Sequence, residues 1–322
     1  MKTVIVDGNN NFIRQYVANP TLNTNGEPVG GAVGLIRNVK GYLRDFAPDR
    51  LVVVWDGEGG SQRRRGIYSE YKAGRKVRLN REFDSEGGPK EDLGNMVGQF
   101  ELAKKYLKLL GVSQIRVQSV EADDVIAYLC NHVLDEDTKV VITSDHDMYQ
   151  LVNDRCKIYN PLRKETVQAA QVLEKHGCLP ENYILVKALI GDNSDNIDGV
   201  KGMGEKTALK LFPFLAKEIS SLERIFAEAE YNLESGIGKK PSPKYKTVLE
   251  KREMIVQNFE LMQLASPIIS ANATRSIREQ LESEVKLSSF NTQLAFKEDG
   301  LQIKDIDFFI SFREYDMRKR AK

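Results

Sequence analysis

A set of acidic residues stands at positions where their carboxylates could act together. They are Asp7, Asp56, Glu121, Asp123, Asp124, Asp145, Asp147, Asp192 and Asp195. Many carboxylates at one place repel one another, and hard divalent cations with oxygen ligands remove that repulsion. Mg²⁺ prefers a few carboxylates together with waters and substrate phosphate, and Mn²⁺ accepts the same ligands. Taken singly, each acid is explained as a turn residue or a helix cap; taken together, they indicate a metal site.

The chemistry that such a site supports is phosphodiester hydrolysis. Two divalent ions roughly 3.5–4 Å apart can hold the attacking and the leaving oxygens of an in-line displacement. The stretch 121–124 is the densest part of the set, and it opens an apolar run, 125–129, that predicts a helix. Acids in a first helical turn also stabilise the helix dipole by roughly 0.3–1 kcal/mol each, which is the alternative explanation for this stretch.

The elements around these acids predict where they meet. Short β-branched, apolar runs at 2–6, 51–55, 114–117 and 139–143 predict buried strands, and helical patterns separate them. This alternation predicts an α/β fold with a mostly parallel, twisted sheet flanked by helices. Asp7, Asp56 and Asp145 each follow a predicted strand, and Glu121 begins a helix after another. Since ligands bind beyond the carboxyl ends of such strands, we expect these four acids at one rim of the sheet.

The second half of the chain is helical in pattern. Apolar or helical runs at 182–190, 205–212 and 247–264 surround Gly199, Gly202 and Gly204, which lead into Lys206 and Thr207, and a loop is predicted at 234–246. Glycines before a helix N-terminus let backbone N–H groups approach a phosphate, as in a helix-hairpin-helix turn. A plain turn between two helices is the alternative.

A basic segment lies between the second strand and the next helix. Residues 62–81 are rich in Arg and Lys, and they include Tyr71, Lys72 and Arg75. Aromatic side chains among cations suit base stacking combined with phosphate contact. A solvated charged helix or loop is the alternative for this segment taken alone.

Composition narrows the class of protein further. The 322 residues suffice for roughly two domains, and the formal net charge of +1 hides the separation of basic and acidic regions. No run reaches the roughly 18 apolar residues of a membrane span, and no signal region precedes the first strand. The 3 cysteines form no CxxC pair, so we expect a reduced, cytoplasmic protein. The histidines lack metal-ligand spacing, and no GxSxG or Walker A sequence occurs.

The motifs together resemble the 5′-nucleases that include flap endonucleases, the 5′-nuclease domain of bacterial DNA polymerase I and phage 5′-exonucleases of ribonuclease H type. The resemblance covers roughly residues 4–212. It rests on the order and spacing of Val-Asp-Gly at 6–8 with Arg14, Trp-Asp-Gly at 55–57, Tyr-Lys-Ala-Gly-Arg at 71–75, Glu-Ala-Asp-Asp at 121–124, Thr-Ser-Asp-His-Asp at 143–147, Gly-Asp-Asn-Ser-Asp-Asn-Ile at 191–197 and the glycine turn after it.

The resemblance implies roles for the named residues. Asp7, Asp56, Glu121 and Asp123 would hold or support one metal, and Asp124, Asp145, Asp147, Asp192 and Asp195 the other, so that 121–124 forms a hinge between two Mg²⁺ or Mn²⁺ ions. Lys72 and Arg75 would be catalytic at the scissile phosphate, Arg14 would contact phosphate, and Tyr71 would stack on an unpaired nucleotide. Residues 199–207 would bind the backbone of the duplex, with a K⁺ ion bound between their carbonyls and a phosphate. Residues 76–95 would belong to an arch, although Asp198 and the acidic second half of the arch depart from the family pattern.

These implications define the expected protein. We expect a PIN-like 5′-nuclease core at 1–180 that includes a basic arch segment at 58–95, a helix-hairpin-helix subdomain at 181–270, and a C-terminal segment at 271–322 packed on the core. Its substrate would be nicked, flap or 5′-ended DNA, or an RNA–DNA hybrid, in replication, and it would act as a monomer with replication proteins as partners. The alternatives are a catalytically silent protein that binds branched DNA and a metal-dependent phosphatase.

Overall fold

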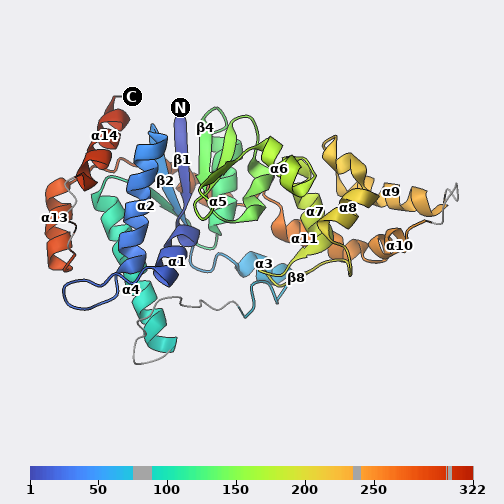
Figure 1. Ribbon diagram of the computed structural model, residues 1–322, viewed down its shortest axis with the longest axis horizontal. Coiled ribbons are helices and arrows are strands. Elements are labelled where there is room, and N and C mark those ends of the chain that lie inside the picture. The colour runs from blue at the N-terminus through green and yellow to red at the C-terminus, as the bar shows by residue number, and fades with distance from the viewer. Residues whose placement is uncertain (75–88, 235–240, 302, 304–306, 322) are drawn as a thin grey trace.

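The computed structural model describes residues 1–74, 89–234, 241–301, 303 and 307–321, of which 89–93 by backbone alone. The chain forms an α/β unit, a helical unit that extends from one end of it, and a group of C-terminal helices at the opposite end (Figure 1). No helix within these described ranges is long and apolar enough to cross a membrane.

The central sheet has the strand order β3-β2-β1-β4-β5-β6. Its first five strands are parallel, and β6 is antiparallel to β5. The strands are β1 (Lys2–Asp7), β2 (Arg50–Trp55), β3 (Ser113–Arg116), β4 (Thr138–Ile142), β5 (Cys156–Asn160) and β6 (Glu165–Val167). Val6 pairs with Val53 of β2 and Ile142 of β4, so the carboxyl ends of the three central strands are level.

Alternate side chains of the strands enter two separate cores. Val4 and Val6 point into one core with Trp55, while Ile5 and Val54 point into the other. All five of these side chains are at most 1% exposed. Burial on both faces explains why the strands are continuous β-branched runs without polar alternation.

Helices cover both faces of the sheet. The first core contains residues of α1 (Gly8–Ala18), α2 (Gly30–Phe46) and α4 (Pro89–Leu109), together with the C-terminal α13 (Ser289–Glu298) and α14 (Phe308–Arg320). The second core contains residues of α5 (Ala122–Tyr128), the π-helical η1 (Leu129–Val133), the 3₁₀ turn η2 (His146–Leu151), α6 (Ala169–His176) and α12 (Ala271–Glu282). The short α3 (Gln62–Ile67) follows β2.

The helical unit continues the second core without a break. It is built from η3 (Pro180–Asn182), α7 (Tyr183–Ile190), the short pair β7 (Gly191–Asp192) and β8 (Ile197–Asp198), α8 (Glu205–Leu211), η4 (Pro213–Ala216), α9 (Leu222–Glu234), α10 (Pro243–Glu250) and α11 (Arg252–Met262). Helix α11 packs along α7, and α10 packs on α9 (Figure 1). A buried asparagine of α11 joins this helix to α7 and β8. The Asn258 amide donates to the carbonyls of Ala188 in α7 (3.1 Å) and Asp198 in β8 (2.7 Å).

The mostly parallel α/β fold and the helical second unit are confirmed, and two local predictions are corrected. The apolar run 125–129 lies in a helix, as predicted, and this helix changes from α-helical to π-helical geometry at Leu129. The predicted helix at 247–264 is two helices separated at Lys251, and the first of them already begins at Pro243, inside the predicted loop, where Ser242 caps it. Strand β6 has only three residues, too few for a periodic signal.

Candidate active site

The carboxyl ends of the central strands place four aspartates around one hollow. Asp7 ends β1, Asp56 follows β2, Asp123 lies in the first turn of α5, and Asp145 follows β4. The hollow has a volume of about 310 Å³, and its lining also includes Asn9, Asn10, Ile13, Arg14, Lys72 and Ala122. The predicted meeting of acids from separate strands is therefore present in the structure.

Local hydrogen bonds orient these carboxylates. The Asn10 N–H (3.0 Å) and the Thr143 hydroxyl (2.8 Å) donate to the two oxygens of Asp7. One oxygen of Asp56 accepts the N–H of Ala122 at the start of α5 (2.8 Å). Asp56 therefore links the end of β2 to the start of α5, and Asp7 links the end of β1 to the residue after β4.

The electrostatic environment of the hollow disfavours ionised carboxylates. Burial raises the pKa of Asp7 to about 7, and the neighbouring Asp56 and Asp145 contribute to the rise against the hydrogen bonds from Asn10 and Thr143. Burial and then Asp145 raise the pKa of Asp123 well above its usual range, although Lys72 opposes them. Such a group of oxygen donors is stabilised in its ionised form by a bound cation.

A second acidic hollow of about 380 Å³ adjoins η2. Its lining includes Ser144, Asp145, His146, Asp147, Tyr183, Lys187, Asp192 and Ser194. The Lys187 ammonium lies 3.0 Å from Asp147 and also contacts Asp192, so it bridges these two acids. Burial, followed by the charge of Asp145, raises the pKa of Asp147 to about 7, whereas the bond from Lys187 keeps the pKa of Asp192 low despite its burial.

Lys187 is a site residue that the sequence reasoning missed. It is the one charged residue of the otherwise apolar helix α7, and this isolated position was an available signal. Asp145 is the acid that lines both hollows. Asp145 therefore lies between the two acidic hollows, whereas the stretch 121–124 was predicted to lie between the two metals.

Glu121 and Asp124 do not line either hollow. Both are buried, and the guanidinium of Arg64 pairs with them, with two bonds to Asp124 of 2.7 and 2.9 Å. Glu121 also accepts a hydrogen bond from the Lys72 ammonium (2.7 Å). These contacts do not support the prediction that Asp124 binds a metal, because its oxygens already face a buried cation. Among the acids of 121–124, only Asp123 faces a hollow.

The other predicted residues lie in different surroundings. Tyr71 is only 3% exposed, and its ring lies within the core, which does not support a role as a stacking platform. The carboxylate of Asp195 lies 4.0 Å from the Lys72 ammonium and is absent from the lining of the second hollow. Arg14 lines the first hollow, and its Nε is buried without a hydrogen-bond partner in the structure. Arg75 lies outside the described residues, as does the predicted arch from 76 to 88.

The glycine turn links β8 to α8. Gly202 has φ +69°, a left-handed conformation that suits glycine, and Gly204 is the residue before the first turn of α8. A side chain at Gly199 would overlap the carbonyl of Ile190. Lys206 and Gly204 are exposed on this turn, and Thr207 is half-buried. The Lys244 ammonium from α10 donates to the carbonyl of Lys201, so a cation of the chain itself already contacts this turn.

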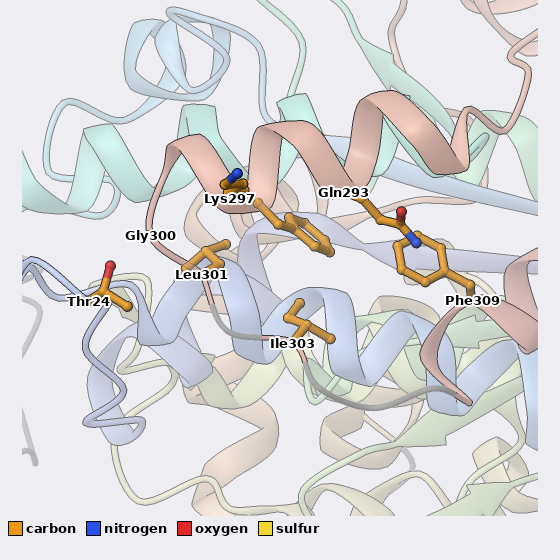
Figure 2. Close-up of a pocket in the computed structure, with 8 residues that line it drawn as sticks. Thr24, Gln293, Lys297, Gly300, Leu301, Ile303 and Phe309 are labelled. Carbon is orange, nitrogen blue, oxygen red and sulfur yellow. The ribbon is translucent and has the colours of Figure 1, made fainter.

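Another hollow is larger than the first acidic one but has different chemistry. It has a volume of about 410 Å³ and lies between α13 and the segment that follows it, where Gln293, Lys297, Leu301 and Ile303 face it (Figure 2). No acidic residue of the described chain lines it. The acidic rim is therefore the candidate active site.

No three His, Cys, Asp or Glu side chains in the described ranges stand as a ready-made metal cage. The carboxylates around the first hollow face one another across open space, which suits an ion that keeps several of its waters. An all-oxygen donor set fits Mg²⁺ or Mn²⁺ better than it fits zinc, which prefers His and Cys.

The raised pKa values predict how stability depends on pH and metal. A carboxyl group whose pKa rises on folding stabilises the fold below its unfolded pKa, near 3.8, and this contribution is lost as pH rises towards 7. We therefore expect the melting temperature in EDTA to fall between pH 5 and pH 8, and Mg²⁺ to reduce the fall because it binds the ionised form. Thermal unfolding with and without Mg²⁺ tests this. In EDTA, the melting temperature of Asp7→Asn should fall less steeply with pH than that of the wild type. The same dependence on pH for the wild type in EDTA, the wild type in Mg²⁺ and Asp7→Asn in EDTA would contradict a metal site at these acids.

Comparisons with known proteins agree with this fold. Residues 2–177 match the model of the 5′-3′ exonuclease N-terminal, resolvase-like domain, and residues 178–284 match the model of the 5′-3′ exonuclease C-terminal SAM fold. The two matches fall on the α/β unit and on the helical unit in turn, and both models describe 5′-3′ exonuclease domains. The chain belongs to the 5′-3′ exonuclease family.

Individual relatives give the extent of the similarity. A 5′-3′ exonuclease of Aquifex aeolicus is 34% identical over 233 residues, which are 71% of this chain and 74% of the relative. A thermostable DNA polymerase I of Thermus thermophilus is 36% identical over 226 residues, which are 70% of this chain. The chain spans only 25% of that polymerase.

Solved structures share the fold at low sequence identity. The T5 D15 protein co-crystallised with metal ions is 19% identical, with a TM-score of 0.69 over 88% of this chain and 99% of that one. The flap endonuclease-1 from Methanococcus jannaschii has a TM-score of 0.53 and 17% identity over 99% of this chain and 93% of that one.

Proposed function

We propose that this chain is a structure-specific 5′-nuclease, a 5′-3′ exonuclease and flap endonuclease that hydrolyses phosphodiesters in DNA replication. The observation that carries the proposal is the hollow in which Asp7, Asp56, Asp123 and Asp145 converge beside the ammonium of Lys72. Family membership and named relatives such as the Bacillus subtilis 5′-3′ exonuclease, 32% identical over 238 residues, support it.

Divalent metal ions are the cofactor that the acidic rim fits. Asp7, Asp56, Asp123 and Asp145 would hold one ion, and Asp145 with Asp147 and Asp192 would hold a second after Lys187 moves away from them. Bound ions of this kind activate a water and stabilise the charge that develops on the phosphate. Metal ions are named for the T5 D15 protein, and zinc is named for another structure of T5 5′-exonuclease. Mg²⁺, with Mn²⁺ as a substitute, is the choice that the carboxylate donors favour.

The chain's own cations would position the substrate. Lys72 and Arg14 both line the first hollow, and the buried Nε of Arg14 has no hydrogen-bond partner among the described residues. Both suit contact with a phosphodiester held between the acids and the basic side of the hollow. The glycine turn at 199–204, with Lys206 exposed beside it, would contact the backbone of the duplex further along. A flap endonuclease related in fold is described in complex with DNA, which agrees with a DNA substrate.

Several finer predictions accompany this proposal. We infer that nicked, flap and 5′-ended DNA are the substrates, with RNA–DNA hybrids as a further class, and that the protein acts as a monomer in the cytoplasm alongside replication proteins. Potassium at the glycine turn also stays a prediction; the contact of Lys244 with the Lys201 carbonyl would compete with it.

One experiment tests the proposal directly. A 5′-labelled flap duplex is incubated with the protein in Mg²⁺, in Mn²⁺ and in EDTA. We expect cleavage near the junction with either metal and none in EDTA. Binding of the flap without cleavage in any metal would favour the catalytically silent DNA-binding protein, and hydrolysis of only a small phosphate ester would favour the phosphatase.

A further inference from the structure

Arg64 is the most completely engaged buried cation of the described chain, and the composition of the basic segment gave it no separate role. Its side chain is 4% exposed, in the middle of α3. Its Nε donates to the carbonyl of Leu261 (2.7 Å), near the end of α11 in the helical unit. Its two terminal nitrogens donate to Glu121 and Asp124 at the start of α5. One guanidinium therefore joins the basic segment, the acidic helix and the helical unit.

The contacts use the planar fork of arginine. Nη1 serves Glu121 and Asp124, and Nη2 serves the second oxygen of Asp124 (2.9 Å), while Nε faces a backbone carbonyl in a different direction. A lysine has a single ammonium and cannot reproduce this set of directions. Buried ion pairs contribute little net stability, because desolvation offsets their attraction. The contacts of Arg64 are therefore better explained by the positions in which they hold Glu121, Asp124 and Leu261 than by a gain in stability.

Glu121 links Arg64 to Lys72. One carboxylate oxygen of Glu121 accepts from Arg64, and the other accepts from the Lys72 ammonium at 2.7 Å. The Tyr71 hydroxyl also lies 3.4 Å from the oxygen that faces Arg64. With Arg64 holding one oxygen, the orientation of the carboxylate is set, and its other oxygen accepts from the Lys72 ammonium.

The backbone of Lys72 needs such a restraint. Lys72 has φ +55°, a conformation uncommon for residues other than glycine, asparagine and aspartate. Its N–H donates to the carbonyl of Asp195 at 2.9 Å, and its ammonium lies 4.0 Å from the Asp195 carboxylate. A strained residue of this kind persists only when its surroundings determine its position. Asp195 fixes the backbone, and Glu121 fixes the end of the side chain.

We propose that Arg64 is a positioning residue, which fixes Lys72 at the edge of the acidic hollow through Glu121 and thereby couples the packing of the helical unit to the reaction. The inference rests on the proposed nuclease function for its consequence in catalysis. Arg64 itself touches neither hollow. Its effect on the reaction passes entirely through Glu121 and Lys72, and this property distinguishes it from a residue that serves only the stability of the fold.

Arg64→Lys is the principal variant, since it keeps the buried charge, and Arg65→Lys is its matched control, since Arg65 is the exposed neighbour in the same helix. We expect Arg64→Lys to lower the single-turnover rate of flap cleavage about 10- to 100-fold, the range in which mispositioning acts, with less than about 3-fold change in DNA affinity. In a Lys72→Met background, Arg64→Lys should have no further effect. An equal loss in both backgrounds would overturn the proposal.

A second readout does not depend on cleavage. The rate at which an amine-reactive acylating reagent modifies Lys72 is measured by peptide mass spectrometry on the folded protein. We expect this rate to rise at least several-fold in Arg64→Lys and in Glu121→Gln, and to stay unchanged in Arg65→Lys. Unchanged reactivity in both test variants overturns the proposal. If Arg64→Lys does not fold, Glu121→Gln carries the test. Absence of wild-type cleavage would reject the nuclease function while leaving this readout decisive for the positioning role.

Discussion

Asp145→Asn is expected to abolish cleavage while leaving DNA binding intact. Asp145 follows β4 and is the acid that lines both acidic hollows, so its carboxylate is the one that two metal ions could share. Asparagine has the same shape but lacks the charge. Metal-ion catalysis contributes several kcal/mol, and about 1.4 kcal/mol corresponds to tenfold in rate, so we expect a loss of roughly 10³-fold or more.

The fold should survive this substitution. Asp145 caps η2 by accepting the N–H of Asp147 (2.9 Å), and the amide oxygen of asparagine can accept the same bond. DNA binding should be equal or slightly tighter, because one negative charge is removed near the phosphates.

Single-turnover cleavage at saturating Mg²⁺ and flap affinity measured in EDTA are the two measurements for Asp145→Asn. Asp154→Asn is the matched control, since Asp154 is exposed and lines neither acidic hollow, and it should cleave like the wild type. If affinity and rate fall together in Asp145→Asn, the residue serves substrate binding or folding, and its assignment to metal is rejected.

Lys72→Ala is expected to lower the cleavage rate by roughly 10²- to 10³-fold, the size of the effect when one group that stabilises transition-state charge is removed. The Lys72 side chain lines the first hollow together with the four aspartates. Burial lowers the pKa of Lys72, but the carboxylates of Asp123, Glu121 and Asp195 outweigh burial and raise it overall. The side chain is therefore a permanent cation at the pH of the reaction, so it acts by attracting the phosphate and not by donating a proton.

The pH profile separates these two roles. The wild-type rate should show no falling limb that belongs to Lys72 up to pH 9, and Lys72→Arg should recover part of the rate because it restores the charge. Lys297→Ala is the control, since Lys297 is exposed at the hollow beside α13 (Figure 2). A wild-type rate in Lys72→Ala would remove this residue from the mechanism. Complete failure of Lys72→Arg would indicate that position matters more than charge.

The sequence by itself determined the fold class and the rim where the acids meet. Strand-forming runs end in Asp7, Asp56 and Asp145, and in a parallel sheet all such ends face the same side. This conclusion needs only local patterns and one topological rule, because the order of strands and helices along the chain already specifies a parallel sheet. The motifs also indicated the family, since their order and spacing are properties of the sequence.

The tertiary structure alone decided which acids face the hollow and which face a buried cation. Asp123 and Asp124 are neighbours in the chain, yet adjacent positions of a helix point about 100° apart, so one lines the hollow and the other meets Arg64. The partners lie far apart in sequence: Arg64 is 60 residues from Asp124 and 197 residues from Leu261. No local pattern carries such pairings, because they depend on how α3, α5 and α11 pack together. The same reason accounts for the bridge of Lys187 and the burial of Tyr71.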